Sequence, residues 1–187
     1  MKKTNLLFMG VVLSVLFYTS CKTPEDPIIP NEEEVITTLN FTLTPVGGVN
    51  PVVFSFQDLD GDGGNAPVVT GGTLAANTNY TGVIELLNEL ETPVGNITED
   101  VLAEADEHQF FFQTTQGEVS IAYDDMDTNN NPLGLSTIVS TSGPSTGTIT
   151  VILRHKPNKT ATGVPDGDIT NAGGETDIKV TFNVDIQ

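Results

Sequence analysis

Two histidines, His108 and His155, are the side chains of this sequence best suited to bind a transition metal, and the chain has no others. Glu104 lies four residues before His108, a spacing that puts both side chains on one face of a helix. Glu107 directly precedes His108. Imidazole nitrogens and carboxylate oxygens together bind Zn²⁺ and other divalent ions. If the fold brings His155 to this group, the four residues predict a mixed nitrogen and oxygen metal site.

Two other interpretations of the histidines stay open. A pair of histidines is also able to ligate haem iron from its two axial sides. Alternatively, His108 and His155 are polar residues that cap a hydrophobic core and bind nothing.

A second candidate for ion binding is the segment Asp58-Leu59-Asp60-Gly61-Asp62-Gly63-Gly64. Alternate aspartates in a glycine-rich loop can turn their carboxylates toward one point, and Ca²⁺ takes roughly six to eight oxygen ligands. The segment is not an EF-hand, because Val69 occupies the loop position that needs a bidentate glutamate. Asp58, Asp60 and Asp62 therefore predict a Ca²⁺ loop at the end of a strand, with a polar turn as the alternative.

Other polar segments are better explained as turns. Residues 124–131 and 166–168 repeat the acidic theme, but Asp and Asn also favour turns by bonding to their own backbone. The run Gly143-Pro144-Ser145-Thr146-Gly147 matches the pattern G-x-S-x-G, yet a nucleophile elbow requires a helix after the turn, and the following residues alternate as a strand. Since no nucleophile with a base stands out, we predict that the chain is not an enzyme.

The elements that must position these residues are strands. From Val35 onward, apolar residues recur at every second position, and glycine pairs that suit turns separate the runs. About eight short strands in one domain predict an all-β, two-sheet sandwich of immunoglobulin-like or jelly-roll-like type. The alternating runs are residues 35–43, 52–56, 80–88, 110–115, 118–124, 133–139, 149–153 and 178–186.

One segment does not alternate. Residues 98–108 carry acids near their start and place Val101, Ala105 and His108 on one helical face. Thr98 is of a type that caps helix N-termini. The segment predicts one short helix at an end of the sandwich.

The N-terminus has the features of an export signal. Lys2 and Lys3 precede the twelve-residue apolar run Leu6 to Phe17, which is shorter than the roughly 20 residues a membrane-spanning helix needs. Cys21, the only cysteine, follows Ser20 where a bacterial lipoprotein signal places its lipidated residue. Residues 1–20 are therefore predicted to be a lipoprotein signal peptide, and Cys21 the lipid anchor in a membrane.

The remaining chain divides into a tether and one domain. Residues 21–34 hold three prolines and five acids, a composition that builds no core and gives a stiff, extended spacer. Residues 35–187 then form the single β-sandwich domain, without disulfides because no second cysteine exists.

The charge excludes one class of partner. The formal net charge is −18, and loss of Lys2 and Lys3 with the signal peptide makes it −20. Such a field repels nucleic acid and attracts cations, so we expect no nucleic-acid binding.

The mature sequence resembles a family of small lipoproteins from Bacteroidota. The resemblance covers nearly the whole domain and rests on the segments LNFTLTP, FQDLDGDGG, GTLAANTNYTGVIELLNE, EHQFFFQTT, GTITVILRHKPNK and DITNAGGETDIKVTFNV. Members are often labelled as type 1 periplasmic binding fold proteins, and similar chains are often encoded beside TonB-dependent outer-membrane receptors. The resemblance implies ligand binding and a receptor partner in nutrient or metal uptake. The two α/β lobes that the label implies do not agree with the alternation, so the β-sandwich stays our expectation.

We therefore expect a non-enzymatic, ligand- or metal-binding lipoprotein of the outer membrane, on its periplasmic or its outer face. One rival is a structural or adhesive surface module whose aspartate loops hold Ca²⁺ for rigidity. The other rival is a hydrolase of surface polymers, which needs a cleft with convergent carboxylates or an activated Ser145.

Overall fold

The computed structural model describes residues 34–61 and 64–187. The predicted signal peptide, Cys21, the predicted tether up to residue 33, and Asp62 lie outside the described residues. The chain divides into two units, residues 1–32 and 33–187, and only the second contains described residues. Within the described part, no helix has the length and apolar character needed to cross a bilayer.

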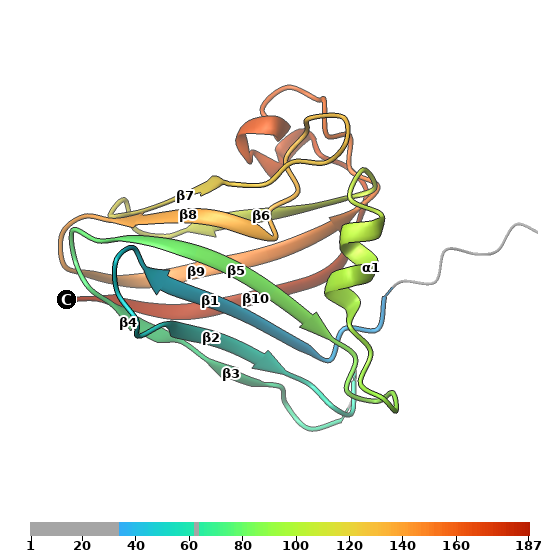
Figure 1. Cartoon of the computed structure of the whole chain (residues 1–187), viewed down its shortest axis with the longest axis horizontal. Helices are drawn as coiled ribbons and strands as arrows, with labels where there is room; N and C mark the ends of the chain where they lie inside the picture. Colours follow the sequence, from blue (N-terminus) through green and yellow to red (C-terminus); the bar gives the residue numbers. More distant parts are fainter. Residues whose placement is uncertain (1–33, 62–63) are drawn as a thin grey trace, which may run out of the picture. The chain divides into compact units, whose positions relative to one another are not determined.

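The described chain forms a sandwich of two β-sheets, which confirms the predicted all-β fold (Figure 1). One sheet has six strands in the order β3-β2-β1-β5-β8-β7, and the other has four in the order β4-β10-β9-β6. Neighbouring strands are antiparallel except β4 and β10, which are parallel. The strands are β1 (Thr38–Pro45), β2 (Val52–Gln57), β3 (Val68–Thr70), β4 (Gly72–Leu74), β5 (Asn79–Leu87), β6 (His108–Thr114), β7 (Val119–Tyr123), β8 (Ser136–Thr141), β9 (Ser145–His155) and β10 (Glu175–Ile186).

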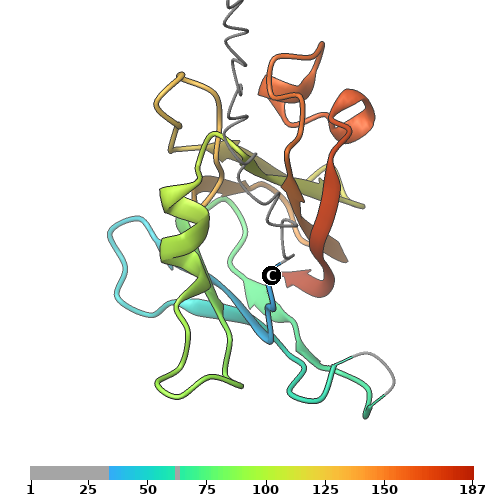
Figure 2. The ribbon, with the colours of Figure 1, turned by 90° about the vertical axis from the view of Figure 1, so that its right-hand side faces the viewer.

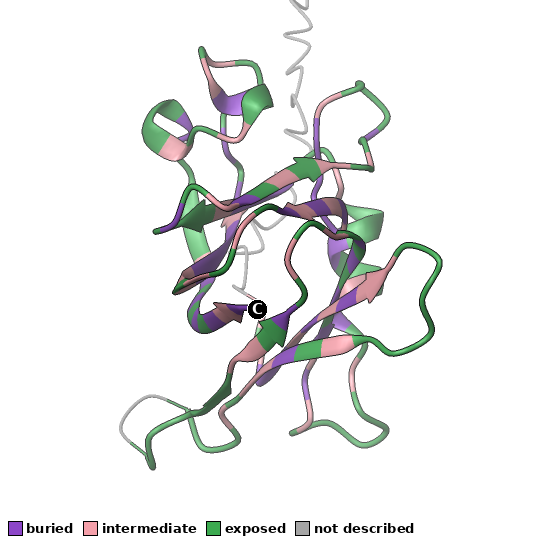
Figure 3. Ribbon diagram, turned by 90° about the vertical axis from the view of Figure 1, so that its left-hand side faces the viewer, coloured by how far each residue is buried: buried purple, intermediate pink, exposed green. Residues whose placement is uncertain are grey.

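The core lies between the sheets because alternate side chains of each strand point inward. Figure 3 shows buried and exposed residues alternating along the ribbon of several strands. Phe54 of β2 meets Phe182 of β10 edge-on, with the ring centroids 5.8 Å apart, so aromatic contacts join the two sheets. Phe41 of β1 contacts Phe54 in the same layer. The two-residue alternation of the sequence therefore arises from this buried layer.

The structure has ten described strands where the alternation predicts about eight. The two additional strands, β3 and β4, have three residues each, too few to show a two-residue period. All of β3 is exposed, so it leaves no hydrophobic signal. The predicted strand that starts at Leu133 begins instead at Ser136, although Leu133 and Leu135 are buried against the core.

The predicted helix is present but shorter than expected. Helix α1 spans Ile97–Ala103 and stands at one end of the sandwich (Figures 1 and 2). The prediction that it continues to residue 108 is wrong, since His108 is the first residue of β6. Thr98 is not the N-cap, a position that belongs to Asn96. The Thr98 hydroxyl instead accepts a hydrogen bond from the Leu86 N–H and donates one to the Leu86 carbonyl, which ties α1 to the end of β5.

A smaller hydrophobic cluster covers the outer face of the four-stranded sheet. Phe111 of β6 and Ile152 of β9 point away from the main core and pack against Val164 and Ala172. These two residues belong to the connection between β9 and β10, which contains two short 3₁₀ helices, Val164–Asp166 and Ile169–Asn171. Both faces of β6 and β9 are thus buried at this end of the sandwich.

Candidate metal centre

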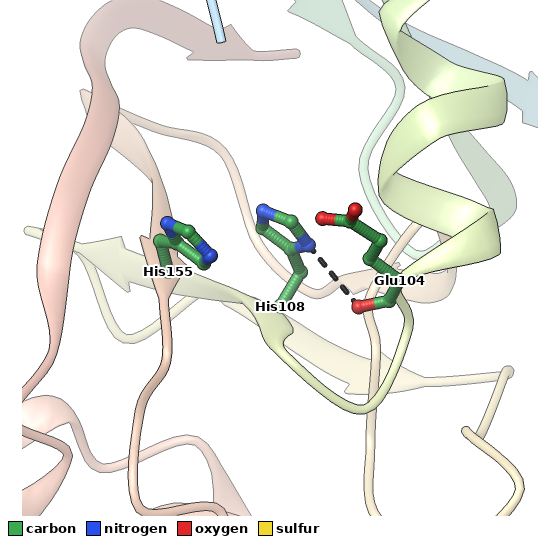
Figure 4. A group of neighbouring side chains, drawn as sticks. All are labelled: Glu104, His108 and His155. Carbon is green, nitrogen blue, oxygen red and sulfur yellow. Dashed lines mark hydrogen bonds between the residues drawn. The ribbon is translucent and has the colours of Figure 1, made fainter. Parts of the chain in front are cut away.

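The two histidines face each other across neighbouring strands. His108 begins β6, His155 ends β9, and the two are direct partners in the antiparallel ladder. Directly opposed residues project to the same side of a sheet, so both rings lie on the core-facing side. The rings stack with centroids 4.7 Å apart and planes 10° apart (Figure 4). Both are buried, with His108 0% and His155 2% exposed.

Glu104 approaches His108 from the turn between α1 and β6. Its backbone carbonyl oxygen lies 3.1 Å from Nδ1 of His108, the contact dashed in Figure 4. Its carboxylate is exposed to solvent but still belongs to a group with His108 and His155, in which the ligand atoms all lie within 4.8 Å of one another. The structure thus brings together three of the four residues of the predicted mixed site, although not through the helical spacing that suggested it.

Glu107 lies beside His155 in an ion-pair arrangement. Its Oε2 is 3.4 Å from Nε2 of His155 and 3.3 Å from Nζ of Lys156. Partial burial opposes ionisation of Glu107, but Lys156 and His155 outweigh this effect and lower the pKa of its carboxyl group. The carboxylate is therefore held by two cationic or hydrogen-bonding neighbours, and it is not a member of the group formed by Glu104, His108 and His155.

A second group of potential ligands shares His108 and was not predicted from the sequence. Nε2 of His108 lies 3.4 Å from Oε1 of Glu34 and 3.8 Å from Oδ2 of Asp177. The ligand atoms of these three residues also lie within 4.8 Å of one another. The Asp177 side chain is completely buried, and that of Glu34 is 15% exposed. His108 therefore has a potential metal-binding environment on both sides.

A β-bulge places Asp177 in this position. In the ladder between β9 and β10, Thr176 pairs with Arg154 and Ile178 pairs with Leu153, so Asp177 is an extra residue. A bulge bends the strand and redirects side chains, and bulges are frequent beside functional sites. Here the bulge lets an aspartate share the buried side of the strand with Ile178.

Lys159 fixes the backbone around the histidine. Its buried ammonium group donates to the carbonyl oxygens of Ala105 and His108, at 2.7 and 2.8 Å. Its Nζ also lies 2.8 Å from Oδ2 of Asp127 in the β7–β8 connection. Burial opposes ionisation of Asp127, but Lys159 and the N–H groups of Asn131 and Asn129 lower its pKa. The ion pair locks the start of β6, and with it His108, against two loops.

The stacking limits how the two histidines can share a ligand. Imidazole lone pairs lie in the ring plane, and these two planes are nearly parallel. The lone pairs of His108 and His155 therefore do not meet at one point unless a ring rotates. Axial haem ligands have their nitrogens facing each other across the iron. The stacked pair does not fit a haem bound by both rings.

The aspartate loop lies between β2 and β3 and forms local turns. Asp58 Oδ1 accepts hydrogen bonds from the N–H groups of Gly61 and Asp60, at 2.9 and 3.3 Å. Asp60 Oδ2 accepts from the backbone and side chain of Asn65, at 3.0 and 2.6 Å, and these bonds lower the pKa of Asp60. Each carboxylate thus has one oxygen engaged by the loop, and Ca²⁺ binding by this loop stays a prediction.

Two further motifs have structural roles. Asp125 accepts hydrogen bonds from the N–H groups of Gly134 and Ser136, at 2.6 and 2.9 Å, so the acidic segment 124–131 organises the entry to β8. Strand β9 begins at Ser145, which confirms that a strand and not a helix follows the G-x-S-x-G pattern.

Comparison with known proteins does not assign the chain to a family. No protein-family model matches it, and no curated protein matches it. Among solved structures, it is similar to domains 4 and 5 of the S-layer protein SbsC, with a TM-score of 0.30 and 14% sequence identity over 78% of this chain and 75% of that one. A likeness this distant carries no argument about function.

Proposed function

We propose that this chain is a lipid-anchored, non-enzymatic protein that binds a divalent transition-metal ion at a centre built around His108. The observation that carries the proposal is the burial of this histidine among carboxylates. Its side chain is inaccessible to solvent, and Nε2 has no hydrogen-bond partner among the described residues. A buried polar atom without a partner costs on the order of 1–3 kcal/mol, and a bound ion would offset that cost.

The surroundings of His108 favour a cation. Carboxylates of Glu34, Asp177 and Glu104 belong to the two groups that include this histidine. The whole chain carries a formal net charge of −18, so its field attracts cations toward such a site. Zn²⁺ and similar ions accept both imidazole nitrogen and carboxylate oxygen, which is the donor set present here.

The anchor and the partner are supported by the sequence. The apolar leader, Cys21 and the proline-rich segment support attachment to the outer membrane. The resemblance to Bacteroidota lipoproteins supports a TonB-dependent receptor as the partner that takes over the captured ion. Cross-linking in native membranes followed by purification of the chain is expected to recover such a receptor. Recovery of the chain alone would contradict this part of the proposal.

Calorimetric titration tests metal binding directly. The chain is purified, stripped of metal with a chelator and titrated with Zn²⁺ and Mn²⁺. We expect saturable binding of at least one ion, and its loss in His108→Gln. Asp106→Asn is the matched control, because Asp106 is an exposed acid in the same turn that belongs to neither ligand group. Absence of affinity in the unmodified chain would refute the proposed function.

A further inference from the structure

The two nitrogens of His108 have different surroundings, and this difference shows which nitrogen carries the ring hydrogen. Nδ1 lies 3.1 Å from the carbonyl oxygen of Glu104. A carbonyl oxygen only accepts hydrogen bonds, so Nδ1 must carry the hydrogen in this contact. In a neutral imidazole the other nitrogen, Nε2, then holds the lone pair. The metal-binding atom of His108 is therefore Nε2.

This lone pair points into a buried acidic environment. Oε1 of Glu34 and Oδ2 of Asp177 lie 3.4 and 3.8 Å from Nε2. Nε2 and Oε2 of Glu34 are both buried and make no hydrogen bond among the described residues. A lone pair beside two carboxylates is repulsive, and low solvent access strengthens that repulsion. A cation between the three groups would turn this repulsion into attraction.

We infer that the metal ion occupies this position, with Nε2 of His108 and the carboxylates of Glu34 and Asp177 as its protein ligands. The inference rests on the proposed function and specifies its ligands. With metal–ligand bonds of about 2.1 Å, two ligands of a tetrahedral ion lie about 3.4 Å apart. The observed nitrogen–oxygen distances of 3.4 and 3.8 Å are close to this value. One imidazole and two carboxylates suit a divalent transition-metal ion such as Zn²⁺, with a fourth position left for water or a receptor ligand.

The other side of His108, which faces Glu104 and His155, is less suitable for a metal ion. Nδ1 is engaged by the Glu104 carbonyl, and the Glu104 side chain is exposed. The ring of His155 stacks on His108 in a nearly parallel plane, so its lone pairs do not converge with Nε2. His155 is therefore a positioning residue that fixes the ring of His108, and the carbonyl of Glu104 fixes its tautomer.

The ligand set connects distant parts of the chain. Glu34 lies four residues before β1, His108 starts β6, and Asp177 lies in the bulge of β10. An ion bound here ties the entry of the domain to strands from the middle and the end of the sequence. Metal binding is thus expected to slow hydrogen exchange of the amides that lead into β1.

The test compares the two sides of His108 in the full chain. We expect Glu34→Gln and Asp177→Asn each to weaken Zn²⁺ binding at least about tenfold. Glu104→Gln keeps the backbone carbonyl that contacts Nδ1 and changes only an exposed side chain, and Asp106→Asn changes an exposed acid outside both ligand groups. Both variants are expected to stay within about threefold of the unmodified chain. X-ray absorption of the Zn²⁺-loaded, unmodified chain should show one imidazole in the coordination sphere, and this measurement needs no variant to fold.

The outcomes separate the inference from the proposed function. If Glu104→Gln abolishes binding while Glu34→Gln or Asp177→Asn does not, or if two imidazoles coordinate the ion, the ligand assignment is refuted and metal binding stands. If the unmodified chain binds no metal, both are refuted.

Discussion

His108 lies directly opposite His155 in the antiparallel pair of β6 and β9, and their rings stack 4.7 Å apart on the core-facing side. The next inward positions on the two strands are filled by Phe110 and Leu153, which also face each other in the ladder. The histidine pair therefore continues the packing of the core to its end, and the same contacts that stabilise the sandwich also orient His108. A change at the His108–His155 pair is therefore expected to alter both the stability of the fold and the orientation of His108.

This coupling predicts that the His155 ring contributes to stability mainly through its packing on His108. His155→Ala should lower the free energy of unfolding by about 2–3 kcal/mol, because it leaves a cavity beside a buried ring. His155→Phe keeps the stacked ring and should cost less than about 1.5 kcal/mol. Urea unfolding of both metal-free variants measures the difference. Equal losses would show that the imidazole group itself, and not its shape, stabilises the strand pair.

Removal of the buried lysine is expected to have a larger effect. Lys159→Met leaves the Asp127 carboxylate buried without its cation and two carbonyl groups without their donor. Breaking a buried ion pair by removing one partner costs about 3–5 kcal/mol. Urea unfolding should show a loss of this size, and addition of Asp127→Asn should restore part of it. Lys179→Met, at an exposed position of β10, is the control and should change stability by less than about 0.5 kcal/mol. A similar loss in both lysine variants would contradict the role given to Lys159.

The sandwich was predictable because burial between two sheets leaves a two-residue period in the sequence. The same alternation predicted that His155, two residues after Leu153, lies on the inner face. The pairing of His155 with His108 depends on strand order, which alternation does not contain, since β6 and β9 are separated by two strands of the other sheet. The helix end was mispredicted because the helical spacing of Val101, Ala105 and His108 continues past the last helical residue.

The remaining parts of the candidate centre had weak sequence signals. Glu34 ends an acidic run that has the composition of a tether. Asp177 reaches the centre through a bulge, and a bulge has no reliable signature in a single sequence. Lys159 stands in a polar segment, where a lysine is usually exposed. The alternation of β10 even points the other way, because it puts Asp177, directly before the inward residue Ile178, on the outer face.

The partly buried hydroxyl of Tyr123 leads us to predict that the protein loses stability at alkaline pH. Its hydroxyl donates to the Phe110 carbonyl at 2.7 Å and accepts from Gln109 at 3.1 Å. Burial raises the pKa of Tyr123 to about 12 from its ordinary value of 10.0. The folded state therefore keeps the proton that the unfolded state loses, so stability is complete below pH 10 and falls as pH rises toward 12.

The size of this loss follows from the difference in pKa. Two pKa units correspond to about 2–3 kcal/mol, an upper value because the tyrosine is only partly shielded from solvent. Urea unfolding at several pH values between 9 and 12 should show a shallower decline in Tyr123→Phe than in the unmodified chain. Identical slopes would mean that other groups account for alkaline unfolding.

The aspartate loop predicts a response to Ca²⁺ that is separate from the histidine centre. Millimolar Ca²⁺ should raise the melting temperature, because ions that bind only the folded state stabilise it. Asp58→Asn and Asp60→Asn should abolish this rise, whereas the surface control Asp106→Asn should keep it. Circular dichroism melting with Ca²⁺ and with chelator measures the shift. An unchanged melting temperature in the unmodified chain would identify the loop as a polar turn held by its own hydrogen bonds.

Cys21→Ser tests the anchor on which the proposed location depends. A lipidated cysteine carries several acyl chains, and each buried CH₂ contributes about 0.8 kcal/mol, so the unmodified chain should sediment with membranes and require detergent for release. The serine variant offers no thiol for lipid attachment and should either accumulate unprocessed or appear in the soluble fraction. Ser20→Ala keeps a small residue before the cysteine and should behave as the unmodified chain does. Fractionation together with mass spectrometry of the N-terminal peptide measures both properties. A mature chain without acyl groups would remove the membrane from the proposed function and leave the metal centre to be tested in a secreted protein.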